Sequence, residues 1–186
     1  MLHGERDGAL AVVTADGDDA LLVEQARRGS ADALAELFER YWPVAWRTAY
    51  ALLASRAAAD DAAQEGLQRA FAALGRFERG RPFEPWLKRI VANRALDELR
   101  REGRRPAAEA RAAILPREPS ADAPALAAAV AALPDEKRAV VVLRYWLDFS
   151  LEEIAAELGV PVGTASSRLS RALEELRRAL GNSDVA

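Results

Sequence analysis

Two groups of basic and polar side chains in this sequence have residue types and spacing that suit nucleic-acid binding. The first group lies near the start of the last helical segment and comprises Thr164, Ser166, Ser167, Arg168, Ser170 and Arg171. Short hydroxyl side chains and arginines on one helix can reach base edges and phosphates in the major groove. The alternative is that the cations only form the solvated face of an amphipathic helix.

The second group lies mid-chain, where a loop rich in glycine and proline leads into a helix. The loop contributes Arg76, Phe77, Arg79, Arg81 and Phe83, and the helix contributes Lys88, Arg89, Asn93, Asp97, Arg100 and Arg101. In single-strand binding, cations follow the backbone while aromatic rings stack on bases or enclose a base that has left the stack. Each aromatic residue is explained at least as well as a core anchor beneath the loop.

A third group, of acidic and amide side chains, precedes this loop. It comprises Asp60, Asp61, Gln64, Glu65 and Gln68. Such a surface can bind a basic partner protein, although carboxylates also favour the start of a helix for electrostatic reasons alone. Gly66 interrupts the same segment, and a glycine inside a helix costs about 1 kcal/mol relative to alanine. We therefore expect another element to pack closely there.

The composition argues against catalysis and against a metal or cofactor site. The 186 residues include no cysteine, and His3 is the single histidine. The chain therefore has no zinc-thiolate site, thiol nucleophile or disulfide framework. No catalytic residue, metal ligand or cofactor is expected. No apolar run is long enough for a signal-peptide core or a membrane span, which predicts a cytoplasmic protein without membrane insertion.

The charge is unevenly distributed along the chain. The formal net charge of −3 by itself argues against a nucleic-acid partner. Residues 1–65, however, hold 6 basic and 12 acidic side chains, whereas residues 76–105 hold 10 basic and 5 acidic. The middle of the chain therefore attracts phosphate although the whole is acidic. We expect weak DNA binding by the free protein and productive contact only after it docks on a partner.

These groups must be positioned by helices. Apolar residues recur at helical spacing from Asp18 onward, which predicts an all-α fold of two small helical domains joined by a flexible linker. The expected divisions are a disordered extension over 1–17, a first domain over 18–102, the linker over 103–124 and a second domain over 125–181.

The second domain carries the signals of a helix-turn-helix. Ser150 and Glu153 have the spacing of a capping box, Gly159 is placed to end that helix, and Thr164 is expected to cap the next one. Two helices joined by a tight turn with glycine form this motif. The capped turn, together with the serines and arginines that follow it, favours duplex DNA as the ligand.

Three stretches, in this order, resemble the extracytoplasmic-function (ECF) sigma factors, the compact bacterial group that retains only regions 2 and 4. DDAAQEGLQRAF resembles region 2.2, PWLKRIVANRALDELRR resembles regions 2.3 to 2.4, and the stretch from LPDEKRAV to ELRRAL resembles region 4. The chain departs from the common pattern at Gly66-Leu67 and at Ala165-Ser166. Because no further residues follow Ala186, the subgroups of this family that carry a fused regulatory module are not expected.

The resemblance implies promoter-specific transcription initiation and promoter melting together with core RNA polymerase. The acidic and amide group would bind the clamp helices of the largest polymerase subunit, and the second domain would contact the flap of the second-largest subunit. The loop and its helix would bind the −10 element, and the group from Thr164 to Arg171 would bind the −35 element. Promoter DNA and an anti-sigma factor are the other implied partners. The alternative is a helix-turn-helix regulator that acts independently of core polymerase.

Overall fold

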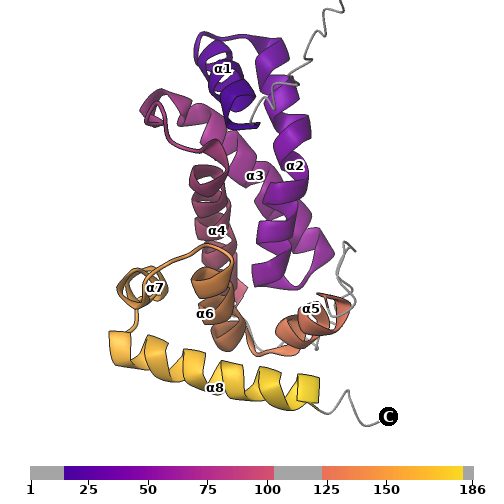
Figure 1. Cartoon of the computed structure of the whole chain (residues 1–186), viewed down its shortest axis with the longest axis vertical. Helices are drawn as coiled ribbons and strands as arrows, with labels where there is room; N and C mark the ends of the chain where they lie inside the picture. The colour runs from indigo at the N-terminus through magenta and orange to yellow at the C-terminus, as the bar shows by residue number, and fades with distance from the viewer. Residues whose placement is uncertain (1–14, 103–122, 182–186) are drawn as a thin grey trace, which may run out of the picture.

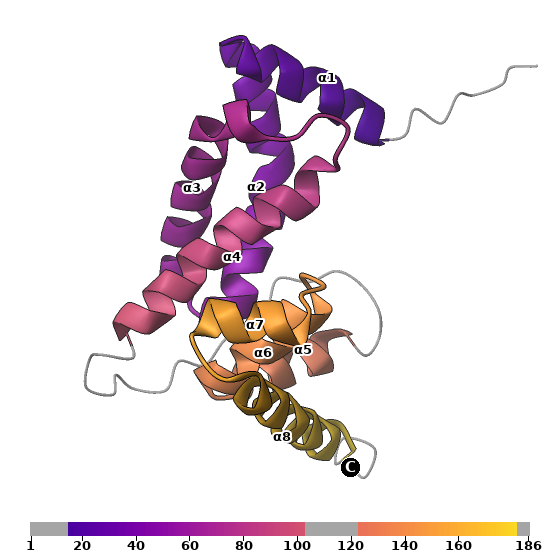
Figure 2. The same cartoon turned by 90° about the vertical axis from the view of Figure 1, so that its left-hand side faces the viewer.

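The computed structural model describes residues 15–102 and 123–181, and every regular element in these ranges is helical (Figures 1 and 2). The helices are α1 (Ala15–Arg27), α2 (Ala31–Leu53), α3 (Arg56–Ala72), the 3₁₀ turn η1 (Leu74–Arg76), α4 (Phe83–Glu102), α5 (Ala123–Ala132), α6 (Asp135–Tyr145), α7 (Leu151–Leu158) and α8 (Val162–Gly181). The all-α prediction is confirmed for this part of the chain. We call α1–α4 the N-terminal half and α5–α8 the C-terminal half.

The ends of several expected segments differ from the observed helices. Because α1 begins at Ala15, residues 15–17 are helical and the expectation of disorder is wrong for them; the rest of the expected extension lies outside the described residues. Likewise α5 begins at Ala123, so residues 123–124 belong to a helix, and the rest of the expected linker also lies outside the description. Alanine and leucine continue a helix readily, and composition alone does not mark where it begins.

Side-chain caps fix several helix starts. The hydroxyl oxygen of Ser30 accepts a hydrogen bond from the backbone N–H of Ala33, and Ser150 and Glu153 form the predicted capping box at α7. Gly159 ends α7 in the left-handed conformation, with φ of 65°. The expectation for Thr164 is wrong, since α8 begins at Val162 and the carbonyl of Pro161 accepts from the N–H of Thr164.

The N-terminal half is built around α2, α3 and α4, with α1 lying across one end (Figure 2). Leu37, Leu52, Leu67 and Leu87 are fully buried between these helices. At Gly66 the helices α3 and α4 approach closely, because a Cβ there would lie 2.7 Å from Cγ2 of Val91. The close packing expected from a glycine inside this helix is confirmed.

The C-terminal half packs α6 against α8, with α5 and α7 on either side. Val140, Leu143, Ile154 and Ala165 are fully buried and join the same apolar core as the N-terminal half. The two halves therefore share one interior in this arrangement. Within the described ranges no helix is both long and apolar enough to cross a bilayer.

Candidate nucleic-acid and polymerase interface

A cavity of about 460 Å³ lies between α1 and the loop that joins η1 to α4. Its wall includes Phe77, Arg79, Arg81 and Phe83, which all belong to the loop part of the second sequence group. The volume falls within the range of about 300–1,000 Å³ that is common for small-ligand pockets. Both phenylalanines are buried, at 7% and 3% exposure, and their rings meet edge to face at 5.6 Å. They are core anchors that also line the cavity, as the alternative interpretation expected.

Helix α1 holds this loop from the opposite side. The guanidinium of Arg27 donates hydrogen bonds to the carbonyl oxygens of Phe77 and Gly75, both at 3.3 Å. Oε1 of Glu24 accepts from Arg79 at 3.0 Å and from Arg28 at 3.1 Å. These bonds fix the course of the loop through its backbone carbonyls and Arg79, and they leave Arg76 and Arg81 exposed to solvent.

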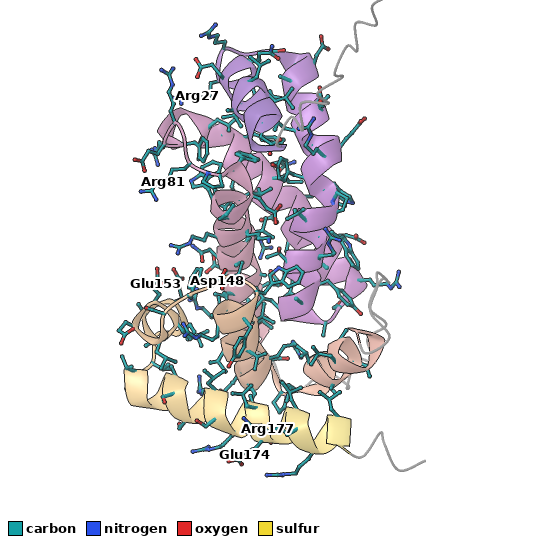
Figure 3. The ribbon with its side chains drawn as sticks, in the orientation of Figure 1. Arg27, Arg81, Asp148, Glu153, Glu174 and Arg177 are labelled. Atoms are coloured by element: carbon teal, nitrogen blue, oxygen red, sulfur yellow. The ribbon has the colours of Figure 1, made fainter. Side chains whose placement is uncertain are left out.

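The electrostatic balance at the cavity is mixed. Partial desolvation raises the pKa of Glu24, but the hydrogen bond from Arg28 and the charge of Arg79 outweigh it and hold the pKa below its usual range. Arg76 and Arg81 are exposed, and Arg81 pairs with Glu78 at 3.2 Å. Arg27 and Arg81 project from the same end of the molecule (Figure 3). The mouth of the cavity is thus rich in cations that can reach a phosphate.

Helix α4 continues from the cavity and places its cations along one side of the N-terminal half. Asn93 and Arg101 are exposed. Arg89 and Arg100 are also exposed, although each contacts the C-terminal half, and Lys88 is half-buried against it. Asp97 is half-buried and accepts a hydrogen bond from Arg100 at 2.8 Å. Asp97 also pairs with Arg69, and a carboxylate held by two arginines repels phosphate less than a free carboxylate does.

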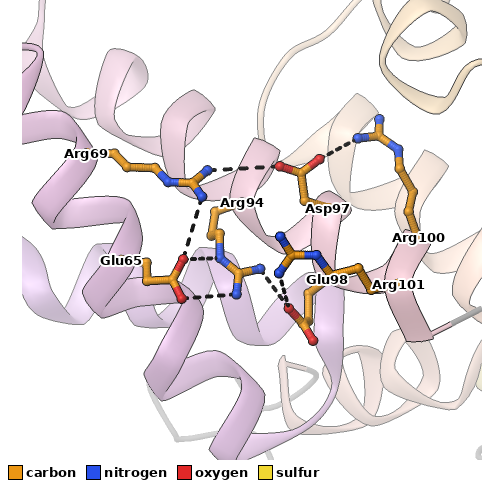
Figure 4. A network of polar contacts seen from close by, with 7 residues as sticks. All are labelled: Glu65, Arg69, Arg94, Asp97, Glu98, Arg100 and Arg101. Atoms are coloured by element: carbon orange, nitrogen blue, oxygen red, sulfur yellow. Dashed lines mark hydrogen bonds and ion pairs between the residues drawn. The ribbon is translucent and has the colours of Figure 1, made fainter.

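A polar network joins α3 to α4 (Figure 4). The guanidinium of Arg94, only 5% exposed, donates to both carboxylate oxygens of Glu65, at 2.5 and 3.2 Å, and to Glu98 at 2.9 Å. The hydrogen bond with Arg94 lowers the pKa of Glu65, and the same bond raises the pKa of Arg94. Sequence reasoning missed Arg94, because a cation buried by its partners looks no different in sequence from the exposed arginines around it.

The acidic and amide group lies on α3, and two of its carboxylates have side-chain partners within the protein. Asp60, Asp61, Gln64 and Gln68 are exposed, and Asp60 also accepts a hydrogen bond from the indole N–H of Trp46 at 2.6 Å. Glu65 is engaged by Arg94, although its side chain is still 45% exposed. All five side chains are therefore accessible to a partner, and neighbouring side chains hold Asp60 and Glu65 in place.

On α8 the hydroxyl and arginine group spreads over more than one face. Ser170 and Arg171 are exposed, whereas Thr164, Ser166 and Ser167 are half-buried, and Ser167 donates a hydrogen bond to the carbonyl of Thr164 at 3.0 Å. Arg168 is 23% exposed and pairs with Glu136 of α6 at 2.8 Å. In this arrangement Arg168 ties α8 to α6, and Arg171 is the better-placed cation for an external ligand.

The structure also adds residues to the site that the sequence patterns did not single out. Glu24 and Arg27 lie on α1, and the sequence patterns assigned no functional role to either residue. A signal was present in the i, i+4 pairing of Glu24 with Arg28. Within residues 15–102 and 123–181 no group of three or more histidine, cysteine, aspartate or glutamate side chains has an arrangement that would hold a metal ion.

Comparison with known proteins agrees with this geometry. Residues 37–105 match the family model of sigma-70 region 2, and residues 124–176 match that of sigma-70 region 4. The chain is 30% identical over 176 residues to the ECF RNA polymerase sigma factor SigW of Bacillus subtilis, covering 85% of this chain and 94% of SigW. It is 34% identical over 166 residues to the ECF RNA polymerase sigma factor SigM of Mycobacterium tuberculosis, covering 88% and 85%.

A solved structure shares the fold. The sigma factor RpoE from Bartonella quintana, crystallised with the anti-sigma factor NepR, matches with a TM-score of 0.57 and 28% identity, covering 79% of this chain and 96% of that one. The two region models match in the expected order, and these relatives and the solved structure are all sigma factors. The chain therefore belongs to the ECF sigma factors, a family of non-enzymatic transcription initiation factors with regions 2 and 4.

Proposed function

We propose that this protein binds core RNA polymerase and directs it to promoters by contacting the −10 and −35 elements. The N-terminal half, over residues 15–102, acts as region 2, and the C-terminal half, over residues 123–181, acts as region 4. Residues 103–122 connect them. The protein works in the cytoplasm, where the polymerase and the promoter are found.

The observation that carries this proposal is the cavity beside the loop that precedes α4. It is large enough for a flipped base, has aromatic walls in Phe77 and Phe83, and has cations at its mouth that can hold the flanking phosphates. Capture of an unstacked base offsets the cost of unpairing it, which is a few kcal/mol. Promoter melting therefore proceeds without nucleotide hydrolysis by this chain.

The other contacts follow from the exposed members of each group. The exposed residues of the acidic and amide group on α3 offer carboxylate and amide groups to the clamp helices of the largest subunit; they are Asp60, Asp61, Gln64 and Gln68. The C-terminal half docks on the flap of the second-largest subunit. Ser170 and Arg171 of α8 face the −35 duplex. Phosphate contacts from the surrounding cations fix the register, and base contacts supply the specificity.

An anti-sigma factor completes the set of proposed partners. The related RpoE was crystallised with the anti-sigma factor NepR. This chain has no cysteine with which to sense oxidants, so a redox signal would have to reach it through such a partner. We propose a protein inhibitor that covers the DNA-binding and polymerase-binding faces.

The direct test is reconstitution with core polymerase. The full chain should co-purify with core enzyme, and sequencing of transcripts made in vitro should show a shared upstream motif with −10 and −35 parts. The variant Arg27→Gln, which loosens the loop, should still bind core enzyme and form fewer melted complexes. Specific duplex binding by the free protein, with no association with core enzyme, would instead favour the independent regulator.

A further inference from the structure

Two carboxylates line the cavity between α1 and the loop that precedes α4, and they differ in what they offer a ligand. Asp19 is 8% exposed; its Oδ1 accepts a hydrogen bond from Arg40 at 2.7 Å, and its Oδ2 accepts one from the hydroxyl of Tyr41. Both oxygens of Asp19 therefore already have partners inside the protein. Glu24, further along α1, has a side chain that is 27% exposed.

The carboxylate of Glu24 is held through one of its two oxygens. Oε1 accepts from Arg79 of the loop at 3.0 Å and from Arg28 at 3.1 Å, whereas no hydrogen bond from the described residues goes to Oε2. Burial would raise the pKa of Glu24, but these two arginines outweigh that effect and lower it, so the group is ionised near neutral pH. An ionised carboxylate accepts hydrogen bonds and donates none. Oε2 is therefore an open acceptor that two arginines hold in the cavity wall.

An acceptor of this kind distinguishes among the DNA bases. A base that has left the stack is read along its Watson–Crick edge. Adenine, cytosine and guanine each carry an exocyclic amino group, which donates hydrogen bonds, whereas thymine carries none. The single N–H on the edge of thymine lies between two carbonyl oxygens, and a carboxylate repels both. Oε2 of Glu24 therefore favours a base with an amino group and disfavours thymine.

The position of Glu24 makes this contact a feature of the tertiary structure. Glu24 precedes Arg79 by 55 residues in the sequence, and α1 brings it to the loop. The match to the sigma-70 region 2 model begins at residue 37, so Glu24 lies outside the segment that the chain shares with that model. Base selection by Glu24 would thus be supplied by a helix that precedes the matched region.

We propose that Glu24 selects the base that enters the cavity, because its Oε2 accepts a hydrogen bond from an exocyclic amino group and excludes thymine. The inference rests on the proposed function of the cavity as the site of a flipped base of the −10 element. Arg28 and Arg79 act as positioning residues, since they hold the carboxylate through Oε1 and leave Oε2 to the base.

Base selection can be measured with the holoenzyme assembled from core polymerase and the full chain. The probe is a set of promoter duplexes with an unpaired, randomised stretch in the non-template strand, and the bound DNA is sequenced. The parent should deplete thymine about tenfold, relative to the amino-bearing bases, at one position of this stretch. Glu24→Gln should reduce the depletion to about twofold or less at that position alone, because an amide can also donate to a thymine oxygen.

Glu78→Gln is the matched control. Glu78 lies on the same loop, is exposed and does not belong to the cavity wall, and the substitution removes the same charge. It should keep the base preference of the parent. If Glu24 only braced the loop, Glu24→Gln would weaken the binding of all four bases alike. That result, or thymine depletion that is unchanged in Glu24→Gln, would overturn the proposal.

Base analogues test the same contact in the parent protein, in case Glu24→Gln fails to fold. The selected base is replaced by its analogue without the amino group, which is purine for adenine, pyrimidinone for cytosine and hypoxanthine for guanine. The replacement should weaken holoenzyme binding about tenfold. Equal binding of the analogue would contradict the proposal. Failure to associate with core enzyme or to melt DNA would overturn the proposed function, whereas melting without base preference at the cavity would overturn this inference alone.

Discussion

Adding one methyl group at Gly66 tests how closely α3 and α4 pack in the N-terminal half, which carries the acidic and amide group. In Gly66→Ala the new Cβ would lie 2.7 Å from Cγ2 and 3.1 Å from Cα of Val91. Carbon atoms pack best at about 3.5–4.0 Å, so α4 must shift to admit the methyl group. The Cα of Val91 is backbone, which a rotamer change cannot move.

The expected magnitude is the difference of two opposing effects. Overpacking of a core costs about 1–3 kcal/mol, while alanine is favoured over glycine in a helix by about 1 kcal/mol. The net loss of unfolding free energy for Gly66→Ala is therefore about 0–2 kcal/mol. Gly163→Ala is the matched control, because nothing lies within 4 Å of a Cβ built there. It should gain stability, so the two variants should differ by about 1–3 kcal/mol.

Urea unfolding followed by circular dichroism measures both variants. Val91→Ala removes Cγ2, so Gly66→Ala should cost less in that background than in the parent, which a double-mutant cycle detects. Should Gly66→Ala stabilise the protein as much as Gly163→Ala does, the close approach of the two helices would be refuted.

Three further predictions follow from the caps, the network and α8. Ser150→Ala should lower the unfolding free energy by about 0.5–2 kcal/mol, measured by urea unfolding, because the capping box is lost. The bond from Arg94 holds the pKa of Glu65 below its ordinary value of 4.5, so its contribution to stability is present above that value and is lost as pH falls; Glu65→Gln should flatten acid unfolding curves. Arg171→Ala should weaken −35 binding by about 1–3 kcal/mol and relax selectivity in promoter assays, whereas Arg178→Ala, paired with Glu174, should not.

Most of the helices could be predicted because their signals are local. Ser30 and the pair Ser150 with Glu153 act within one turn of chain, and Gly159 supplies the left-handed residue that ends α7. Thr164 shows the limit of this reasoning. A threonine near a helix start is compatible with a capping position, but α8 begins earlier, at Val162. Helix starts without a specific side-chain bond are set by the packing around them.

The sequence predicted where the groups of site residues lie, but it did not predict which residues of each group are exposed. Cations and aromatics in one loop indicate a nucleic-acid surface, but the pattern cannot separate the buried ring of Phe77 from an exposed one. Exposure depends on the elements that pack against the loop. Glu24 and Arg27, which hold that loop, are about 50 residues away in sequence, and no local pattern links them to it.

The helical class, the family motifs and the uneven charge can be read from residue types and short-range spacing. Which cations are available to a ligand depends on the tertiary contacts. Arg94 pairs with Glu65 and Glu98, Arg138 donates to a backbone carbonyl of α2, and Arg89 pairs with Glu153 of the other half. A charge keeps the same formal value wherever it lies, but its capacity to bind phosphate depends on neighbours that are distant in sequence and close in space.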